Sequence, residues 1–225
     1  LKQAMQYLNW HINGGAVSVL GTSSGSFSGY QKQQGLTKVE PWPWYRPTVD
    51  IIKALLTIYD IPVLVRGDGI TGIAAAANQA YNEAKAQHLP FKATPIQFAL
   101  PSDKSARQHA RIIRPDIQHS FAKFEFPHLF LQKVVMLQAS NRGCIFVPGG
   151  MGTLNFAFEV LTLIQTEKMK PIPLVFLGSA FWGQYQRLLA GPVLRGGKIS
   201  RAHLGLMSNI VDTAADALRA LRVGA

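Results

Sequence analysis

Cysteine is almost absent from this chain of 225 residues, in which Cys144 is the only one. A single cysteine excludes an intramolecular disulfide and is typical of a reducing compartment. Cys144 lies inside the apolar run 144–147, so we interpret it as a small core residue and not as a nucleophile. We therefore expect a cytoplasmic protein.

Long apolar runs are also missing. The apolar runs end well short of the ~20 residues needed to span a bilayer, so we expect no transmembrane helix and no membrane partner. Residues 1–7 lack a basic stretch followed by an apolar one, so we expect no signal peptide.

Acidic residues are few, with 12 Asp and Glu against 23 Lys and Arg and a net charge of +11. Such an excess favours anionic ligands. The basic residues are scattered, however, and are densest only at 104–114, so we favour a solvated basic surface over nucleic-acid binding. The six His residues are dispersed without metal-ligand spacing, and we expect neither a metal nor a cofactor.

Short apolar runs alternate with longer segments of helical periodicity. Strands are expected at 16–20, 62–65, 95–100, 121–126, 144–147, 173–177 and 209–211. Helices are expected at 2–12, 48–59, 73–87, 127–140, 156–165, 181–189 and 213–221, and polar loops at 27–47 and 102–120. This alternation predicts an α/β fold, a Rossmann-like, mostly parallel sheet with helices on both faces, in a single domain of residues 1–225.

The stretch Val147-Pro-Gly-Gly-Met-Gly-Thr-Leu154 combines a strand end, a glycine turn and a helix start. Glycines let a backbone approach an anion closely and adopt positive φ. The free N–H groups of the helix start then face a phosphate, and Thr153 adds a hydroxyl. We predict a phosphate site here, the alternative being a glycine-rich turn without a ligand. Its candidate residues are Gly149, Gly150, Met151, Gly152, Thr153 and Asn155.

Two further loops rich in Gly, Ser or Thr follow other strands of the predicted sheet. The loop 21–26 offers Gly21, Thr22 and Ser23, and the loop 67–72 offers Gly67, Asp68, Gly69 and Thr71. The second loop matches G-x-G-x-x-G literally, but it follows the second strand and is not a dinucleotide fingerprint. Because the loops after residues 20, 66, 100 and 147 share the carboxyl edge of a parallel sheet, we expect them to converge on one ligand.

The run Pro148-Gly-Gly-Met-Gly-Thr153, with Glu159 beyond it, resembles the P-G-G-x-G-T-x-x-E motif of the LOG ("Lonely guy") phosphoribohydrolases, proteins that are often labelled lysine decarboxylases. The resemblance covers nearly the whole chain. It continues through 67–73 with Asn78, Leu100–Pro101, 124–126, Lys133, 177–182 and 197–200.

The resemblance implies a Rossmann-like homodimer that cleaves the N-glycosidic bond of nucleoside 5′-monophosphates to free base and ribose 5-phosphate. In that family the glycine motif holds the phosphate, and an Arg and a Glu near the ribose assist cleavage. A carboxylate suits this role because glycoside cleavage passes through an oxocarbenium-like state.

This chain departs from the family pattern at the residues that carry the chemistry. The family's Arg-Lys pair is Gln132–Lys133, and the final Glu of the glycine motif is Phe156. A further family Arg is Pro127, and a Met and a Glu of the second glycine helix are Ala74 and Ala75. Whether the chain is an enzyme is therefore open from its sequence.

The sequence supports two hypotheses about function almost equally well. In the first, the chain is a hydrolase with altered chemistry, in which Gln132 and Lys133 stand at the family's Arg-Lys pair, Lys133 replaces the lost charge, and Glu159 or Glu125 replaces the lost acid. In the second, it is a non-catalytic protein that binds a nucleotide or a phosphate-bearing cofactor, as the related molybdenum-cofactor carriers do.

Overall fold

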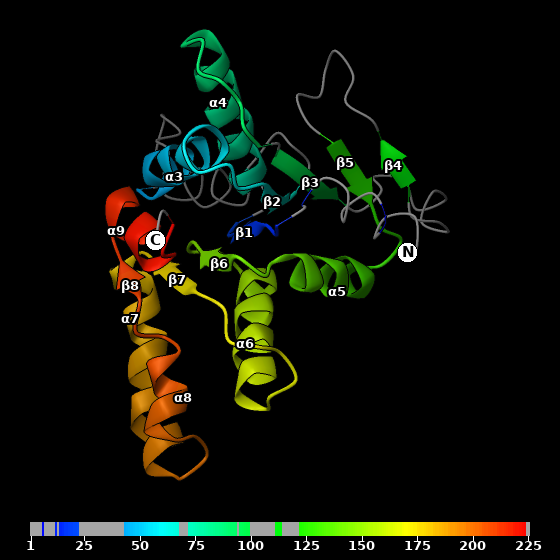
Figure 1. The fold of residues 1–225 in the computed structure, drawn as a ribbon. Coiled ribbons are helices and arrows are strands. Elements are labelled where there is room, and N and C mark those ends of the chain that lie inside the picture. Colours follow the sequence, from blue (N-terminus) through cyan, green and yellow to red (C-terminus); the bar gives the residue numbers. More distant parts are fainter. Residues whose placement is uncertain are drawn as a thin grey trace, which may run out of the picture.

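A single eight-stranded sheet forms the centre of the computed structural model, which describes residues 6, 12, 14–22, 43–67, 72–93, 95–99, 111–113 and 122–223 (Figure 1). The strands are β1 (Val17–Leu20), β2 (Val63–Arg66), β3 (Pro95–Ala99), β4 (Arg111–Ile113), β5 (Ala122–Glu125), β6 (Gly143–Phe146), β7 (Leu174–Leu177) and β8 (Ile210–Val211). The described helices are α3 (Tyr45–Thr57), α4 (Gly72–Ala86), α5 (Leu129–Ala139), α6 (Met151–Gln165), α7 (Ser179–Leu188), α8 (Arg201–Gly205) and α9 (Ala214–Ala220), with a π-helical segment η2 (Leu189–Val193) after α7.

The strand order is β4-β5-β3-β2-β1-β6-β7-β8, and every neighbouring pair is parallel except β4 with β5. The chain builds one side of the sheet outward from β1 and then returns to place β6 on the other side of β1. The order therefore reverses between β1 and β6. In open α/β sheets this reversal opens a crevice at the carboxyl ends of the two strands.

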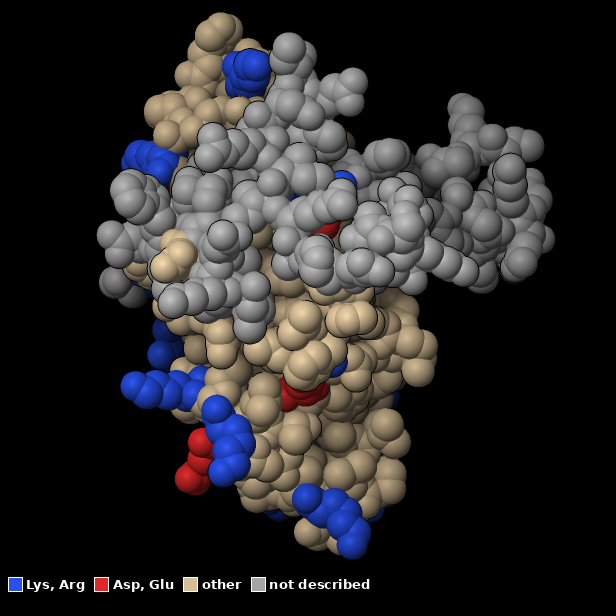
Figure 2. Space-filling view, turned by 90° about the vertical axis from the view of Figure 1, so that its right-hand side faces the viewer, with Lys and Arg blue, Asp and Glu red and all other residues tan. Residues whose placement is uncertain are grey.

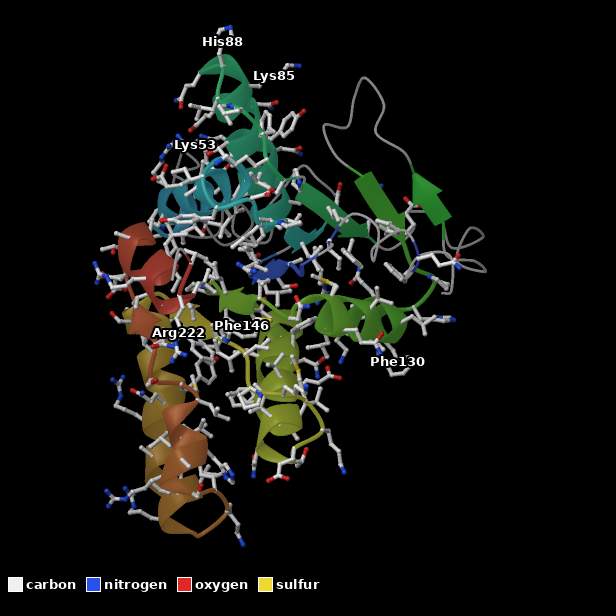
Figure 3. All side chains as sticks on the ribbon, viewed as in Figure 1. Lys53, Lys85, His88, Phe130, Phe146 and Arg222 are labelled. Atoms are coloured by element: carbon white, nitrogen blue, oxygen red, sulfur yellow. The ribbon has the colours of Figure 1, made fainter. Side chains whose placement is uncertain are left out.

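Successive side chains of the central strands point to opposite faces of the sheet, and both faces are apolar. In β6 and just after it, Cys144 and Phe146 belong to one core cluster, whereas Ile145 and Val147 belong to the other. Helices α5, α6 and α7 cover the first face, and α3, α4 and α9 cover the second (Figure 1). Figure 3 shows Phe146 on the side of α6 and Phe130 pointing away from the fold. The predicted mostly parallel sheet with helices on both faces is confirmed.

Three predicted helix starts were wrong, those of α3, α5 and α6. Helix α3 begins at Tyr45 instead of residue 48, because Pro47 falls in its first turn, where a missing N–H costs nothing. Helix α6 begins at Met151 instead of residue 156, so Gly152 and Thr153 are part of its first turn.

Pro127 does not occupy the first helical position predicted for it. His128 is the N-cap of α5 and has an extended backbone, so Pro127 precedes the helix. An N-cap residue has a non-helical backbone, and His128 (φ −135°, ψ 139°) meets this condition, so the helix proper begins at Leu129.

The segment 102–120 was predicted to be a loop throughout, but it contains β4, which pairs antiparallel with β5. A strand of three residues carries too little periodicity to be recognised in a polar segment. The predicted helix at 2–12 and most of the predicted loop at 27–47 lie outside the described residues.

Candidate functional site

The carboxyl ends of β1 and β6 meet at the reversal of the strand order. Leu20 pairs with Phe146, and the N–H of Val147 donates to the carbonyl of Leu20 at 2.7 Å. Just beyond, the hydroxyl of Thr153 donates to the carbonyl of Gly21 at 2.8 Å. The loop after β1 and the glycine turn after β6 are therefore joined into one surface, as predicted for loops at this edge.

Gly149 is required by a close approach of two backbone segments. A Cβ at this position would lie 2.3 Å from Thr153 Oγ1 and 2.8 Å from the backbone N of Thr22. The predicted need for positive φ was wrong here, because none of Gly149, Gly150 and Gly152 has a positive φ. Gly149 is therefore present for space, whereas a Cβ on Gly150 or Gly152 would meet no atom closer than 3.8 Å among the described residues.

The first turn of α6 has unused hydrogen-bond donors. Its N-cap, Gly150, is extended (φ −81°, ψ −165°), and the helix has neither a capping side chain nor an acidic residue in its first turn. Within the part of the chain that the structure describes, the N–H groups of Gly150, Met151 and Gly152 donate to no acceptor. Nothing described lies within 4 Å of a Cβ on Gly150, and 81% of Met151 is exposed. Such a turn can accept an anion.

The loop after β2 reaches the same place. The N–H of Ile73, in the first turn of α4, donates to the carbonyl of Thr22 at 3.0 Å. Gly67 has φ of 135°, and the buried side chain of Gln97 donates from Nε2 to its carbonyl at 2.7 Å. The other predicted residues of these loops, Ser23, Asp68, Gly69 and Thr71, lie outside the described residues.

Arg66, the last residue of β2, was missed by the sequence interpretation. Its Nη2 lies 3.8 Å from the position that a Cβ on Gly152 would take, so the guanidinium reaches the first turn of α6. Burial lowers the pKa of Arg66 below its ordinary value. An arginine that ends an apolar strand directly before a glycine loop is the signal that could have identified it.

Lys133 and Glu159, both predicted to be catalytic, form an ion pair. Lys133 Nζ, on α5, donates to Glu159 Oε2 at 2.5 Å and to Asn155 Oδ1 at 2.8 Å, and both acceptors lie on α6. The contact holds two helices together, and it neutralises the charge of each partner. The other proposed acid, Glu125, forms an ion pair with Lys123 at 3.0 Å.

Gln132 and Phe156 are both buried. The side chain of Phe156 is fully inaccessible and packs against Phe146, with ring centroids 6.5 Å apart. Gln132 is 2% exposed, and among the described residues its Oε1 has no hydrogen-bond partner. Phe156, the residue that the sequence comparison set against the motif's final Glu, is therefore part of the apolar core.

A model of the protein family described as "possible lysine decarboxylase" matches residues 75–221, well over half of the chain. The chain belongs to this family. The match includes the glycine turn, the whole of α5 and α6 and the second half of the sheet, so the resemblance that the sequence suggested is confirmed at the level of the family. A search of curated proteins finds no match.

The described residues were also compared with what a metal site, a membrane-spanning helix and a nucleic-acid-binding surface require. No group of three or more His, Cys, Asp or Glu side chains is placed to hold a metal ion there. None of the described helices is long and apolar enough to cross a membrane. On the face shown in Figure 2, Lys and Arg side chains lie mainly near the margins of the described surface, with no continuous basic track across its middle.

Proposed function

We propose that this family member binds a nucleoside 5′-monophosphate, with the phosphate at the first turn of α6 and the sugar beside the loops after β1 and β2. The observation that carries the proposal is a set of N–H groups, at Gly150, Met151 and Gly152, that have no acceptor among the described residues and lie where the strand order reverses. A phosphate at this position would accept these donors and benefit from the positive end of the helix dipole.

We propose further that the family's N-glycosidic cleavage is lost or very slow. Phe156 replaces the carboxylate and is sealed in the core, and Gln132 carries no charge. Removal of one such group typically lowers the rate by ~10²–10⁴-fold. The phosphate cradle depends on glycines and on backbone contacts, so binding does not require the missing groups.

Gly150→Asp tests the binding site without disturbing the fold. A side chain at Gly150 meets open space, and Asp is a favoured N-cap residue, so the variant should melt at the temperature of the wild type or above it. Its carboxylate would occupy the free N–H groups and repel a phosphate. Gly150→Asn is the matched control, since it places a cap of the same shape without the charge.

Calorimetric titration with AMP, other nucleoside monophosphates and adenosine is the measurement. We expect the wild type to bind a monophosphate more tightly than its nucleoside, Gly150→Asp to weaken this binding at least about tenfold, and Gly150→Asn to weaken it less. Equal binding by the wild type and Gly150→Asp would contradict the proposal. Molybdenum cofactor in the same panel tests the alternative ligand class.

Altered hydrolysis is the second candidate, favoured by the ion pair of Lys133, on α5, with Glu159, on α6. In this candidate, Lys133 supplies the positive charge and Glu159 orients water. Incubation with AMP and other monophosphates decides between the two candidates. Release of free base above a control without protein, and its loss in Glu159→Gln, would support hydrolysis over binding alone.

A further inference from the structure

Arg66 reaches the phosphate position from a strand that does not border the crevice. The order β2-β1-β6 places β1 between Arg66 and the strand that leads into α6. The guanidinium nevertheless reaches the turn after β6, where Nη2 lies 3.8 Å from the Cβ position of Gly152. It therefore lies beside the same turn as the unused N–H groups.

The charge of Arg66 is not balanced by the described residues. Among them, Arg66 forms no ion pair and no side-chain hydrogen bond, and neither α4 nor α6 has an acidic residue in its first turn. Removing a cation from water without a partner costs free energy, which is why burial lowers its pKa. A bound anion would offset the desolvation free energy of the Arg66 guanidinium by pairing with its charge.

The backbone next to Arg66 is held in place. The N–H of Gly67 donates to the carbonyl of Phe98 at 3.1 Å, and Gln97 Nε2 donates to the carbonyl of Gly67. Gln97 is 1% exposed, so its side chain approaches this bond from the interior of the protein. The peptide that follows Arg66 is thereby fixed, which reduces the conformational freedom that Arg66 would lose on binding.

We infer that Arg66 is the charged residue that recognises the ligand's phosphate, together with the N–H groups of the first turn of α6, and that it makes the site selective for phosphorylated over unphosphorylated nucleosides. This inference rests on the proposed function and adds the residue that determines its selectivity. A guanidinium offers a planar pair of donors that matches two phosphate oxygens, which a lysine cannot reproduce.

Arg66→Met and Arg66→Lys test the inference, with Arg142→Met as the matched control. Arg142 is exposed and precedes β6 at the amino edge of the sheet, so its loss removes the same charge far from the crevice. We expect Arg66→Met to weaken AMP binding about 10- to 100-fold and to leave adenosine binding unchanged. Arg66→Lys should recover part of the loss, and Arg142→Met should change AMP binding less than about twofold.

The melting temperature without ligand separates recognition from a structural role. Because Arg66 is a desolvated cation without a described partner, Arg66→Met should melt at the wild-type temperature or above it. A lower melting temperature together with equal losses for AMP and adenosine would overturn the inference. Undiminished AMP binding by Arg66→Met would overturn it as well.

Inorganic phosphate distinguishes a failure of this inference from a failure of the proposed function. If the wild type binds no nucleoside monophosphate, the proposed function fails, but phosphate should still raise the melting temperature above that in chloride at equal ionic strength. This rise should be absent in Arg66→Met. A rise of equal size in both proteins, or in neither, would overturn the role of Arg66.

Discussion

At the scale of single residues, Gly149 and Gly150 stand next to each other for different physical reasons. Gly149 is needed because a side chain would collide with Thr153 and with the loop after β1, whereas Gly150 faces open space. The fold requires the first glycine, and the proposed anion site would require the second. Substitutions at the two positions should therefore affect different measurements.

Gly149→Ala should lower the free energy of unfolding by about 1–3 kcal/mol, because its Cβ forces the glycine turn away from Gly21 and Thr22. Gly205→Ala is the control, since a Cβ there meets nothing within 4 Å and alanine favours the helix. Denaturant unfolding of both variants is the measurement. Equal stability of Gly149→Ala and the wild type would contradict the close contact.

Phe156→Ala should lower the free energy of unfolding by about 3–5 kcal/mol, because a fully buried ring is removed from the core between the sheet and α6. Phe130→Ala is the matched control. Phe130 is 63% exposed and points away from the fold (Figure 3), so its loss should change stability by less than about 0.5 kcal/mol. Similar losses in the two variants would be inconsistent with the buried position of Phe156.

Several residues of the site could be predicted from the sequence, and others could not. The glycines, Thr153 and the approach of Gly21 followed from a motif at a strand end. Arg66 and Gln97 did not follow, because their roles depend on which strands become neighbours and on the directions in which their side chains point. The pairing of Lys133 with Glu159 likewise depends on how α5 packs against α6.

At the scale of elements, a network of charged side chains joins α3 to α4. Glu83, on α4, accepts hydrogen bonds from Arg46 at 2.6 Å and from Lys53 at 3.4 Å, both on α3. Arg46 also pairs with Asp50 on its own helix. The Arg46 guanidinium, with help from Gln79, lowers the pKa of Glu83 from 4.5 to about 2.

The stability contributed by Glu83 should be present above pH 4.5 and should be lost as the pH falls toward 2. The unfolded chain takes up the Glu83 proton at a higher pH than the folded chain does, so acid favours unfolding. In Glu83→Gln, the free energy of unfolding should fall less steeply than in the wild type as the pH is lowered from 4.5 to about 2. Glu167→Gln, at an exposed carboxylate without an ion pair among the described residues, is the matched control for removal of a carboxylate, and urea unfolding at several pH values is the measurement.

The ion pair between α5 and α6 should couple these helices energetically. Lys133→Met and Glu159→Gln should each destabilise the protein, and the double variant should lose less than the sum, with a coupling of about 0.5–3 kcal/mol. Denaturant unfolding of the four proteins gives this value. Additive losses would show that the contact between Lys133 and Glu159 contributes nothing to stability. Such a result would favour the hydrolytic candidate, in which the two groups act on a substrate.

The strands of the parallel sheet could be predicted from the sequence because their buried apolar runs are short and end at Gly, Pro or Ser. The starts of α3, α5 and α6 were misplaced by a few residues. Proline and glycine lie near all three starts, and these residues occur both in loops and in the first turn of a helix. Helix α8 was missed because five residues carry little periodicity.

At the scale of the whole molecule, the topology explains why distant segments share one site. Residues 21–22, 66–67 and 149–153 are brought together because β2, β1 and β6 are adjacent and parallel. The excess of basic residues over acidic ones favours an anionic ligand in general. In the proposed function, the N–H groups at the start of α6 that have no acceptor among the described residues, together with Arg66, would direct that preference to one edge of the sheet.

A crystal structure of the protein with AMP tests the central claim most directly. The account predicts the phosphate within about 3 Å of the N–H groups of Gly150, Met151 and Gly152, with the Arg66 guanidinium on the same oxygens and the N-glycosidic bond intact. A phosphate at another place on the molecule, or ribose 5-phosphate without its base at this turn, would contradict it.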